Sequence, residues 1–254
     1  MNVEPPVFHT PLVRKLEQFT RLSPDERRAI DEAAGARVHR LEARRDVIRE
    51  GDRPEAVNLI LKGWACRYKL LPDGRRQIAA LLLPGDLCDL NVYILSEMDH
   101  SIGALTPLTY AEITRDAFDR LVEGHPRIMQ ALWWDALVTV AVQREWTTNV
   151  AQRSSFERMA HLLCELFHRL RAVGLVENNS CHLPLTQAEL ADALGMTPVH
   201  ANRTIRELRE RGLLRLEAKR LTLIDLPGLE RASMFNPNYL HLGREGRRLD
   251  ANAG

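Results

Sequence analysis

The side chains best suited to bind another molecule gather between positions 186 and 220. They carry hydroxyl, amide, imidazole, ammonium and guanidinium groups: Thr186, Gln187, Thr197, His200, Asn202, Arg203, Lys219 and Arg220. Groups of this kind donate hydrogen bonds to phosphate oxygens and to the edges of nucleic-acid bases. The chain shows no paired carboxylates, nucleophile elbow, phosphate loop or metal motif, so no enzymatic activity is expected. The stretch therefore points to binding rather than catalysis.

Two short helices joined by a tight turn are expected to position these groups, in the segment LTQAELADALGMTPVHANRTIRELRERGLL. The first helix should begin after the N-cap Thr186 and end at Gly195, which readily adopts a left-handed conformation. The second should begin at Thr197-Pro198, an N-cap followed by proline at the first helical position. This order is typical of a DNA-binding helix-turn-helix, whose second helix enters the major groove. An αα-hairpin inside a larger helical core is the alternative.

A strand, a tight loop and a second strand are expected after the second helix. They occupy Leu213–Leu216, Ala218–Arg220 and Leu221–Ile224, and would form a wing beside the recognition helix. The net charge of the whole chain is only +1, which is weak support for a nucleic-acid partner. Basic side chains are nevertheless concentrated on and after the second helix: Arg203, Arg206, Arg209, Arg211, Arg215, Lys219 and Arg220. A solvated helix face, with Glu207 and Arg211 paired, would explain part of this cluster.

The 254 residues suffice for two domains. No apolar run approaches the ~20 residues that span a membrane, and the N-terminus lacks the order of a secretory signal. We therefore expect a cytoplasmic protein with no membrane partner. The four cysteines, Cys66, Cys88, Cys164 and Cys181, form no CxxC pair, so free thiols are expected and no structural zinc or iron–sulfur cluster. A thiol redox switch is the alternative.

Short apolar runs separated by turn signals extend from about Ala36 to Thr114. The turns are Glu50-Gly51-Asp52, Lys62-Gly63, Pro72-Asp73-Gly74, Pro84-Gly85-Asp86 and Ile102-Gly103. Strands at this regular spacing indicate an antiparallel sandwich or barrel.

A long helix should follow His125-Pro126, and it is apolar nearly all the way round from Ile128 to Val142. Such a helix must be buried on every side. A seam of 3.5-residue spacing suits pairing with a second copy: Met129, Leu132, Ala136, Thr139, Gln143 and Trp146. The remaining face, with Trp133, Leu137 and Val140, would then pack on a β domain. A central helix in a monomeric core is the alternative.

These elements divide the chain into four parts. We expect a β-rich sensor over residues 1–126, a dimerisation helix and hinge over 127–153, a winged helix-turn-helix over 154–242 and a polar tail over 243–254.

This order of parts resembles the Crp/Fnr family of bacterial transcription regulators, over about residues 12–228. The resemblance rests on the glycine-containing turns of the β-rich part and on the helix-turn-helix segment. It implies an α+β fold, with an antiparallel β jelly roll of the cyclic-nucleotide-binding type, a long dimer helix and a C-terminal winged helix. It also implies a homodimer that binds palindromic double-stranded DNA, with RNA polymerase as a further partner.

The resemblance also implies roles for single residues. Arg203 stands where the family reads a guanine, and a guanidinium can donate both to O6 and to N7. Thr186, Gln187 and Thr197 match phosphate-contacting positions, as do Lys219 and Arg220 in the wing. Pro198 and Val199 depart from the polar pair often found there, so the preferred site should differ, with His200 and Asn202 as further groove-edge candidates. A salt bridge from Arg203 to Glu207 is the alternative for that arginine.

The sensor departs further from the cyclic-nucleotide binders of the family. Asp89 and Leu90 stand at the glycine–glutamate positions, and His100-Ser101 stands where arginine–serine would hold the phosphate. A carboxylate repels a cyclic phosphate, and histidine is no bidentate guanidinium. We therefore expect no tight cAMP binding, no cofactor, and an unknown small-molecule effector or none. The N-terminal cysteine cluster of the oxygen-sensing branch is missing, whereas haem ligation by His100 or His125 stays open as an alternative.

A second function of another class also stays open. The β domain would then be a ligand-, gas- or redox-sensing module that regulates a partner protein, and the winged helix would be a protein-interaction element.

Overall fold

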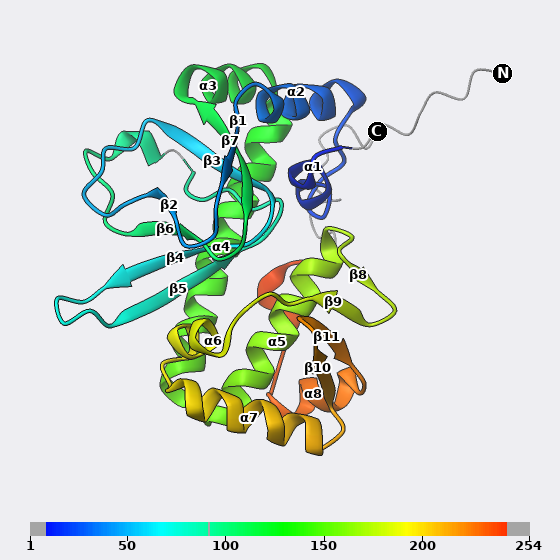
Figure 1. Ribbon diagram of the computed structural model, residues 1–254. Helices are drawn as coiled ribbons and strands as arrows, with labels where there is room; N and C mark the ends of the chain where they lie inside the picture. The colour runs from blue at the N-terminus through cyan, green and yellow to red at the C-terminus, as the bar shows by residue number, and fades with distance from the viewer. Residues whose placement is uncertain (1–8, 91, 243–254) are drawn as a thin grey trace.

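The computed structural model describes residues 9–90 and 92–242. The expected polar tail, 243–254, lies outside the described residues. Figure 1 shows a β-rich upper half, a helical lower half and the long helix α4 running between them. The expected α+β architecture of β-roll, long helix and winged helix is confirmed.

The β-roll consists of two antiparallel sheets. One sheet has the strand order β1-β7-β3 and the other β2-β6-β4-β5. Their strands are β1 (Val38–Leu41), β2 (Asp46–Ile48), β3 (Ala56–Lys62), β4 (Ala65–Leu70), β5 (Arg76–Leu82), β6 (Ser101–Ala104) and β7 (Leu108–Thr114), with a 3₁₀ turn η1 (Val92–Ile94) before β6. The predicted turn at Pro72-Asp73-Gly74 joins β4 to β5, and Gly74 has a φ of +87°.

Three short helices flank the roll: α1 (Pro11–Leu16), α2 (Pro24–Gly35) and α3 (Arg115–Gly124). Ser23 starts α2 with a capping box, and Thr114 caps α3. Helix α1 lies against the loop after β5, because a Cβ on Gly85 would meet the carbonyl oxygen of Pro11 at 2.8 Å. Gly85 has a φ of +97°, so glycine suits this position for two reasons.

The helical half contains the winged helix. Its elements are α5 (Ser155–Ala172), β8 (Val176–Glu177), β9 (Ser180–His182), α6 (Gln187–Leu194), α7 (Pro198–Glu210), β10 (Leu214–Glu217), β11 (Arg220–Leu223), α8 (Leu226–Ala232) and the 3₁₀ turn η2 (Pro237–Leu240). The strands form one antiparallel sheet of order β10-β11-β9-β8. The β8–β9 hairpin was not predicted. Its turn residues Asn178 and Asn179 both have positive φ, which Asn tolerates well, so the pair was an available turn signal.

Helix α4 (Pro126–Gln152) buries part of the expected dimer seam within the chain itself. Leu132 and Trp146, two residues of the predicted seam, are only 2% and 8% exposed and are buried within the chain. Met129, Ala136 and Gln143 are half-buried, and Thr139 is exposed. The exposed apolar row is instead Trp133, Leu137 and Val140, at 62%, 66% and 51%. A helix that is apolar on all sides has two rows of apolar residues at similar spacing. Which row is buried within the chain depends on the elements that pack against the helix.

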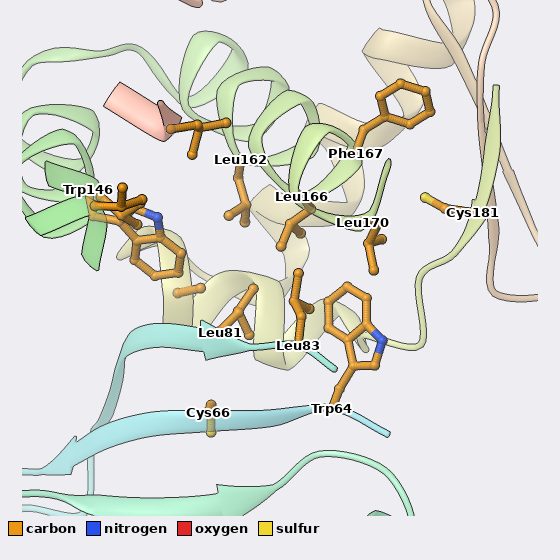
Figure 2. Packing of buried hydrophobic residues seen from close by; sticks show 14 of the residues in the cluster. Trp64, Cys66, Leu81, Leu83, Trp146, Leu162, Leu166, Phe167, Leu170 and Cys181 are labelled. Atoms are coloured by element: carbon orange, nitrogen blue, oxygen red, sulfur yellow. The ribbon is translucent and has the colours of Figure 1, made fainter. Parts of the chain in front are cut away.

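The two halves share one core. A single cluster of buried apolar residues extends from α1 through the roll and α4 to the helical half. Figure 2 shows Leu81 and Leu83 of the roll facing Leu166 and Leu170 of α5. The helical half therefore packs directly on the outer face of the roll.

A buried ionic network crosses the same boundary. Asp86, in the loop after β5, binds Lys15 Nζ of α1 at 2.8 Å and Arg169 Nη2 of α5 at 2.8 Å. Lys15 also binds Asp135 of α4 at 2.6 Å. Glu165 of α5 accepts from Arg169 at 3.1 Å, and also from Trp146 and Tyr239 at 2.9 to 3.1 Å. Four separate segments thus meet around paired charges, as buried charges require.

Within the described part of the chain, every helix is too short or too polar to cross a membrane.

Candidate nucleic-acid interface

The helix-turn-helix is built by the local signals that the sequence predicts. The Thr186 hydroxyl accepts from Glu189 N at 3.2 Å, and the Glu189 carboxylate accepts from Thr186 N at 2.7 Å. Gly195 ends α6 in the left-handed region with φ +62°. The Thr197 hydroxyl caps α7 by accepting from His200 N at 3.2 Å. Both threonine hydroxyls keep their own proton for an external acceptor such as a phosphate.

Helix α7 has one buried and one exposed face, and the lower edge of the molecule in Figure 1 is formed by this helix. Ala201, Ile205 and Leu208 are buried, as predicted for the inward face. Val199 is 81% exposed, and Pro198 and Arg203 beside it are exposed as well. The exposed side is the N-terminal turn, the part of a recognition helix that meets base edges.

Arg203 is not engaged by Glu207. Glu207 instead pairs with Arg211 at 2.5 Å, which confirms the exposed pair expected from the sequence. The guanidinium of Arg203 donates to Nε2 of His200 at 3.3 Å, one turn earlier. This contact joins two of the predicted DNA-binding residues of α7.

The wing forms as predicted, with β10 and β11 in antiparallel register from Leu214 opposite Leu223 to Glu217 opposite Arg220. Ala218 and Lys219 form the turn, and both have positive φ. The side chains of Lys219 and Arg220 are exposed there.

A groove of about 510 Å³ lies between the start of α6, the middle of α7 and the wing tip. Its polar lining residues are Thr186, Gln187, Asn202, Arg206, Arg209, Lys219 and the acidic Glu217. The structure thus brings together predicted residues from three elements. Arg206 and Arg209, which the sequence places only in the general basic cluster, line the groove with them.

The back of the helix-turn-helix is held by the β-roll. Arg76 of β5 binds Asp192 of α6 at 2.9 Å, and Gln77 donates to Ala193 O at 3.4 Å. These contacts lie on the side of α6 away from the groove, since Asp192 and Ala193 do not line it.

The predicted effector residues separate into two groups. Asp89 and His100 lie together, with His100 Nε2 3.1 Å from Asp89 Oδ2. Ser101 instead accepts from Glu50 N at 3.0 Å, and Leu90 packs on the core. The free space beside Asp89 is about 10 Å³, which is the room that one water needs.

Arg67 of β4 is the pocket residue that sequence reasoning missed. Its Nη2 lies 2.9 Å from Asp89 Oδ1, and its Nε lies 3.1 Å from His100 Nε2. The signal was an arginine inside the otherwise apolar half of a strand, in WACRYKL. Both ring nitrogens of His100 are engaged, because Nδ1 lies 2.6 Å from Asp99 Oδ1. His100 therefore does not fit the alternative of a haem ligand.

The four cysteines are free and buried. Burial raises the pKa of Cys66 and Cys164 to about 12 and that of Cys181 to about 11. Burial raises the pKa of Cys88 as well. Thiols in such surroundings stay protonated and unreactive at neutral pH, which disfavours a thiol switch. Within residues 9–90 and 92–242, no three His, Cys, Asp or Glu side chains gather as a metal site.

Comparison with known proteins agrees with this geometry. Residues 38–125 match the model of the cyclic nucleotide-binding domain, and residues 157–232 match the Crp-like helix-turn-helix domain. The transcriptional activator protein FnrL of Cereibacter sphaeroides is 30% identical over 186 residues, which cover 72% of this chain and 74% of FnrL. The nitrogen fixation regulation protein FixK of Bradyrhizobium diazoefficiens is 29% identical over 194 residues, 76% of this chain and 80% of FixK.

The structure of FixK2 from Bradyrhizobium japonicum shares the fold, with a TM-score of 0.70 and 22% identity over 78% of this chain and 98% of that one. These relatives are transcription regulators and not enzymes, which agrees with the prediction from the sequence. The helix-turn-helix, the β-roll and the relatives together show that the chain belongs to the Crp/Fnr family of DNA-binding transcription regulators.

Proposed function

We propose that the chain acts as a homodimer and binds a palindromic DNA site through two copies of α7. The observation that carries the proposal is the division of α7, which buries Ala201, Ile205 and Leu208 while its N-terminal turn stays exposed. In this proposal Arg203 donates to a guanine, and the exposed methyls of Val199 contact a thymine methyl. Thr186, Gln187, Thr197, Lys219 and Arg220 hold phosphates, and His200 and Asn202 lie at the groove edge.

The second copy would bind along α4. Trp133, Leu137 and Val140 follow one another at helical spacing and are all more than half exposed. Exposed apolar rows of this kind are typical of an interface between helices. A two-fold axis along α4 would present two recognition helices together, so that the spacing of the half-sites would follow from the dimer.

Transcription control would require contact with RNA polymerase. Several relatives are named as activators, and we propose activation for this chain on that likeness. The effector is proposed to be something other than cAMP, because the Asp89 carboxylate would repel a cyclic phosphate and already binds Arg67 at 2.9 Å.

The test is selection of bound sequences from random duplex DNA by the purified protein, followed by affinity measurements on the selected site. Two inverted half-sites are expected, and Arg203→Ala should lose about 1–3 kcal/mol of binding and relax specificity at one base pair per half-site. Arg28→Ala, an exposed arginine of α2, is the control. Selection of no consensus, or an unchanged affinity of Arg203→Ala, would refute the proposal. An absorbance spectrum of the purified protein would reveal a haem or an iron–sulfur cluster.

A further inference from the structure

The effector pocket of the β-roll is filled by the chain itself. Arg67, Asp89 and His100 lie within 2.9 to 3.1 Å of one another and are mostly buried, with side-chain exposures of 15%, 22% and 12%. Arg67 also donates to the carbonyl oxygen of Cys88. The two cationic or donor groups come from β4 and from the residue before β6, whereas the carboxylate comes from the loop after β5.

Arginine with a neighbouring imidazole is a chemistry that recognises carboxylates and phosphates. Here the anion between them is a side chain on a loop, and little space remains beside it. We propose that Arg67 and His100 form an anion-binding site whose resident ligand is the Asp89 carboxylate. Asp89 would be a built-in effector, and the empty site would take a small carboxylate or phosphate.

The loop that carries Asp89 also reaches the helical half. Three residues earlier, Asp86 is held by Lys15 and by Arg169 of α5, both at 2.8 Å. Backbone bonds tie the loop to β3, from Ile60 N to Asp86 O at 2.9 Å and from Cys88 N to Asn58 O at 2.7 Å. Displacement of Asp89 is therefore expected to strain the Asp86–Arg169 contact and to change how α5 and α7 are presented. This step rests on the DNA-binding function proposed above.

The other charges at the site lie at its rim. Lys69 pairs with Glu50 at 2.5 Å, and Asp99 is 83% exposed. Lys69 donates to Glu50 and to the carbonyl oxygen of Asp99, whereas Arg67 donates to Asp89. Asp89 is thus the anion placed between Arg67 and His100 inside the pocket.

The experiment compares the wild type with Asp89→Ala, and with Asp73→Ala as the matched control, since Asp73 pairs with Arg75 on the exposed β4–β5 turn. Thermal melting in acetate or inorganic phosphate, at constant ionic strength, measures anion binding without DNA. A saturable rise of the melting temperature is expected for Asp89→Ala alone, and it should vanish in the Arg67→Ala, Asp89→Ala double variant. Absence of any rise in Asp89→Ala would overturn the anion site.

Operator affinity measures the coupling. Asp89→Ala should bind the selected operator about tenfold more weakly, and acetate should restore the affinity where an equal concentration of chloride does not. Unchanged affinity would overturn the built-in effector. If Asp89→Ala does not fold, Asp89→Asn keeps the side-chain volume and should still weaken operator binding, without rescue by acetate. A wild type that binds no operator would instead refute the proposed function, and the melting experiment would still decide the anion site.

Discussion

Arg169 and Asp86 join the DNA-binding half of the chain to its β-roll through a contact of 2.8 Å. Arg169 lies on α5, which leads into the helix-turn-helix, and Asp86 lies on the loop that also carries Asp89. Burial alone would raise the pKa of Asp86, but the charges of Lys15 and Arg169 outweigh it, so its pKa lies below the ordinary value. The carboxylate therefore stays ionised inside the protein and holds two cations from different segments.

Asp86→Asn should strongly destabilise the protein. The change leaves the buried cations Lys15 and Arg169 without the negative charge of Asp86. Breaking a buried ion pair in this way typically lowers the free energy of unfolding by about 3–5 kcal/mol. In the wild type this stabilisation is present above the unfolded pKa of about 3.9 and is lost as the pH falls through the lower folded value. Urea unfolding of Asp86→Asn measures the loss, with Asp73→Asn as an exposed control. A loss below about 1 kcal/mol, the range of surface pairs, would contradict the role of the network.

His161 should make the stability depend on pH. Burial and then the charge of Arg153 lower its pKa to about 3, so the folded state keeps it neutral. The unfolded state takes up the proton below about pH 6.5, so stability falls from there downward, by at most about 1.4 kcal/mol per pH unit.

The control for His161 is an aromatic replacement. His161→Phe keeps a ring beside Phe235 and Tyr239, with which His161 now packs at centroid distances of 5.0 and 6.0 Å. Urea midpoints at pH 7, 6 and 5 should fall less steeply in this variant than in the wild type. Parallel pH profiles of the two proteins would show that His161 is not the titrating group.

Lys219→Ala should weaken DNA binding without changing the preferred sequence. A lysine at the wing tip neutralises a phosphate, so the plot of log affinity against log salt should become shallower by about 0.9. Arg28→Ala should leave the slope unchanged. A changed base preference in Lys219→Ala would mean that the wing reads bases instead.

Leu137→Glu should produce monomers. A charge in the exposed row of α4 would be buried against the partner copy, and such burial is costly when the charge is unpaired. Sedimentation velocity would measure the oligomeric state, and affinity for a full operator should fall toward that for one half-site. Leu70→Glu, at the last position of β4, where Leu70 is 57% exposed, is the matched control. A dimeric Leu137→Glu would place the interface elsewhere.

The sequence allowed prediction of those parts that local chemistry determines. Thr186, Gly195 and Thr197 lie where caps and a left-handed residue are required, so both helices of the motif and the wing could be placed from residue types alone. The β-roll followed from regularly spaced turns. These features depend on neighbours a few positions apart.

The features that were missed depend on distant contacts. Trp146 lies on the internal face of α4 and donates to Glu165 of α5, a partner that no spacing rule contains. Arg67 reaches Asp89 only because β4 lies beside the loop in space. Of the four predicted effector residues, only Asp89 and His100 lie together, because Ser101 binds the backbone of Glu50 instead.

The continuous core between Leu81, Leu83 and helix α5 means that the two halves of this protein are not interchangeable parts. Grafting residues 154–242 onto another β-roll of the family would uncover Leu166 and Leu170 and deprive Arg169 of the Asp86 carboxylate. A working chimera would have to carry α1 and the end of β5 with it. Over evolutionary time, substitutions in these segments should therefore covary with substitutions in α5, so that the β-roll and the DNA-binding half diverge together.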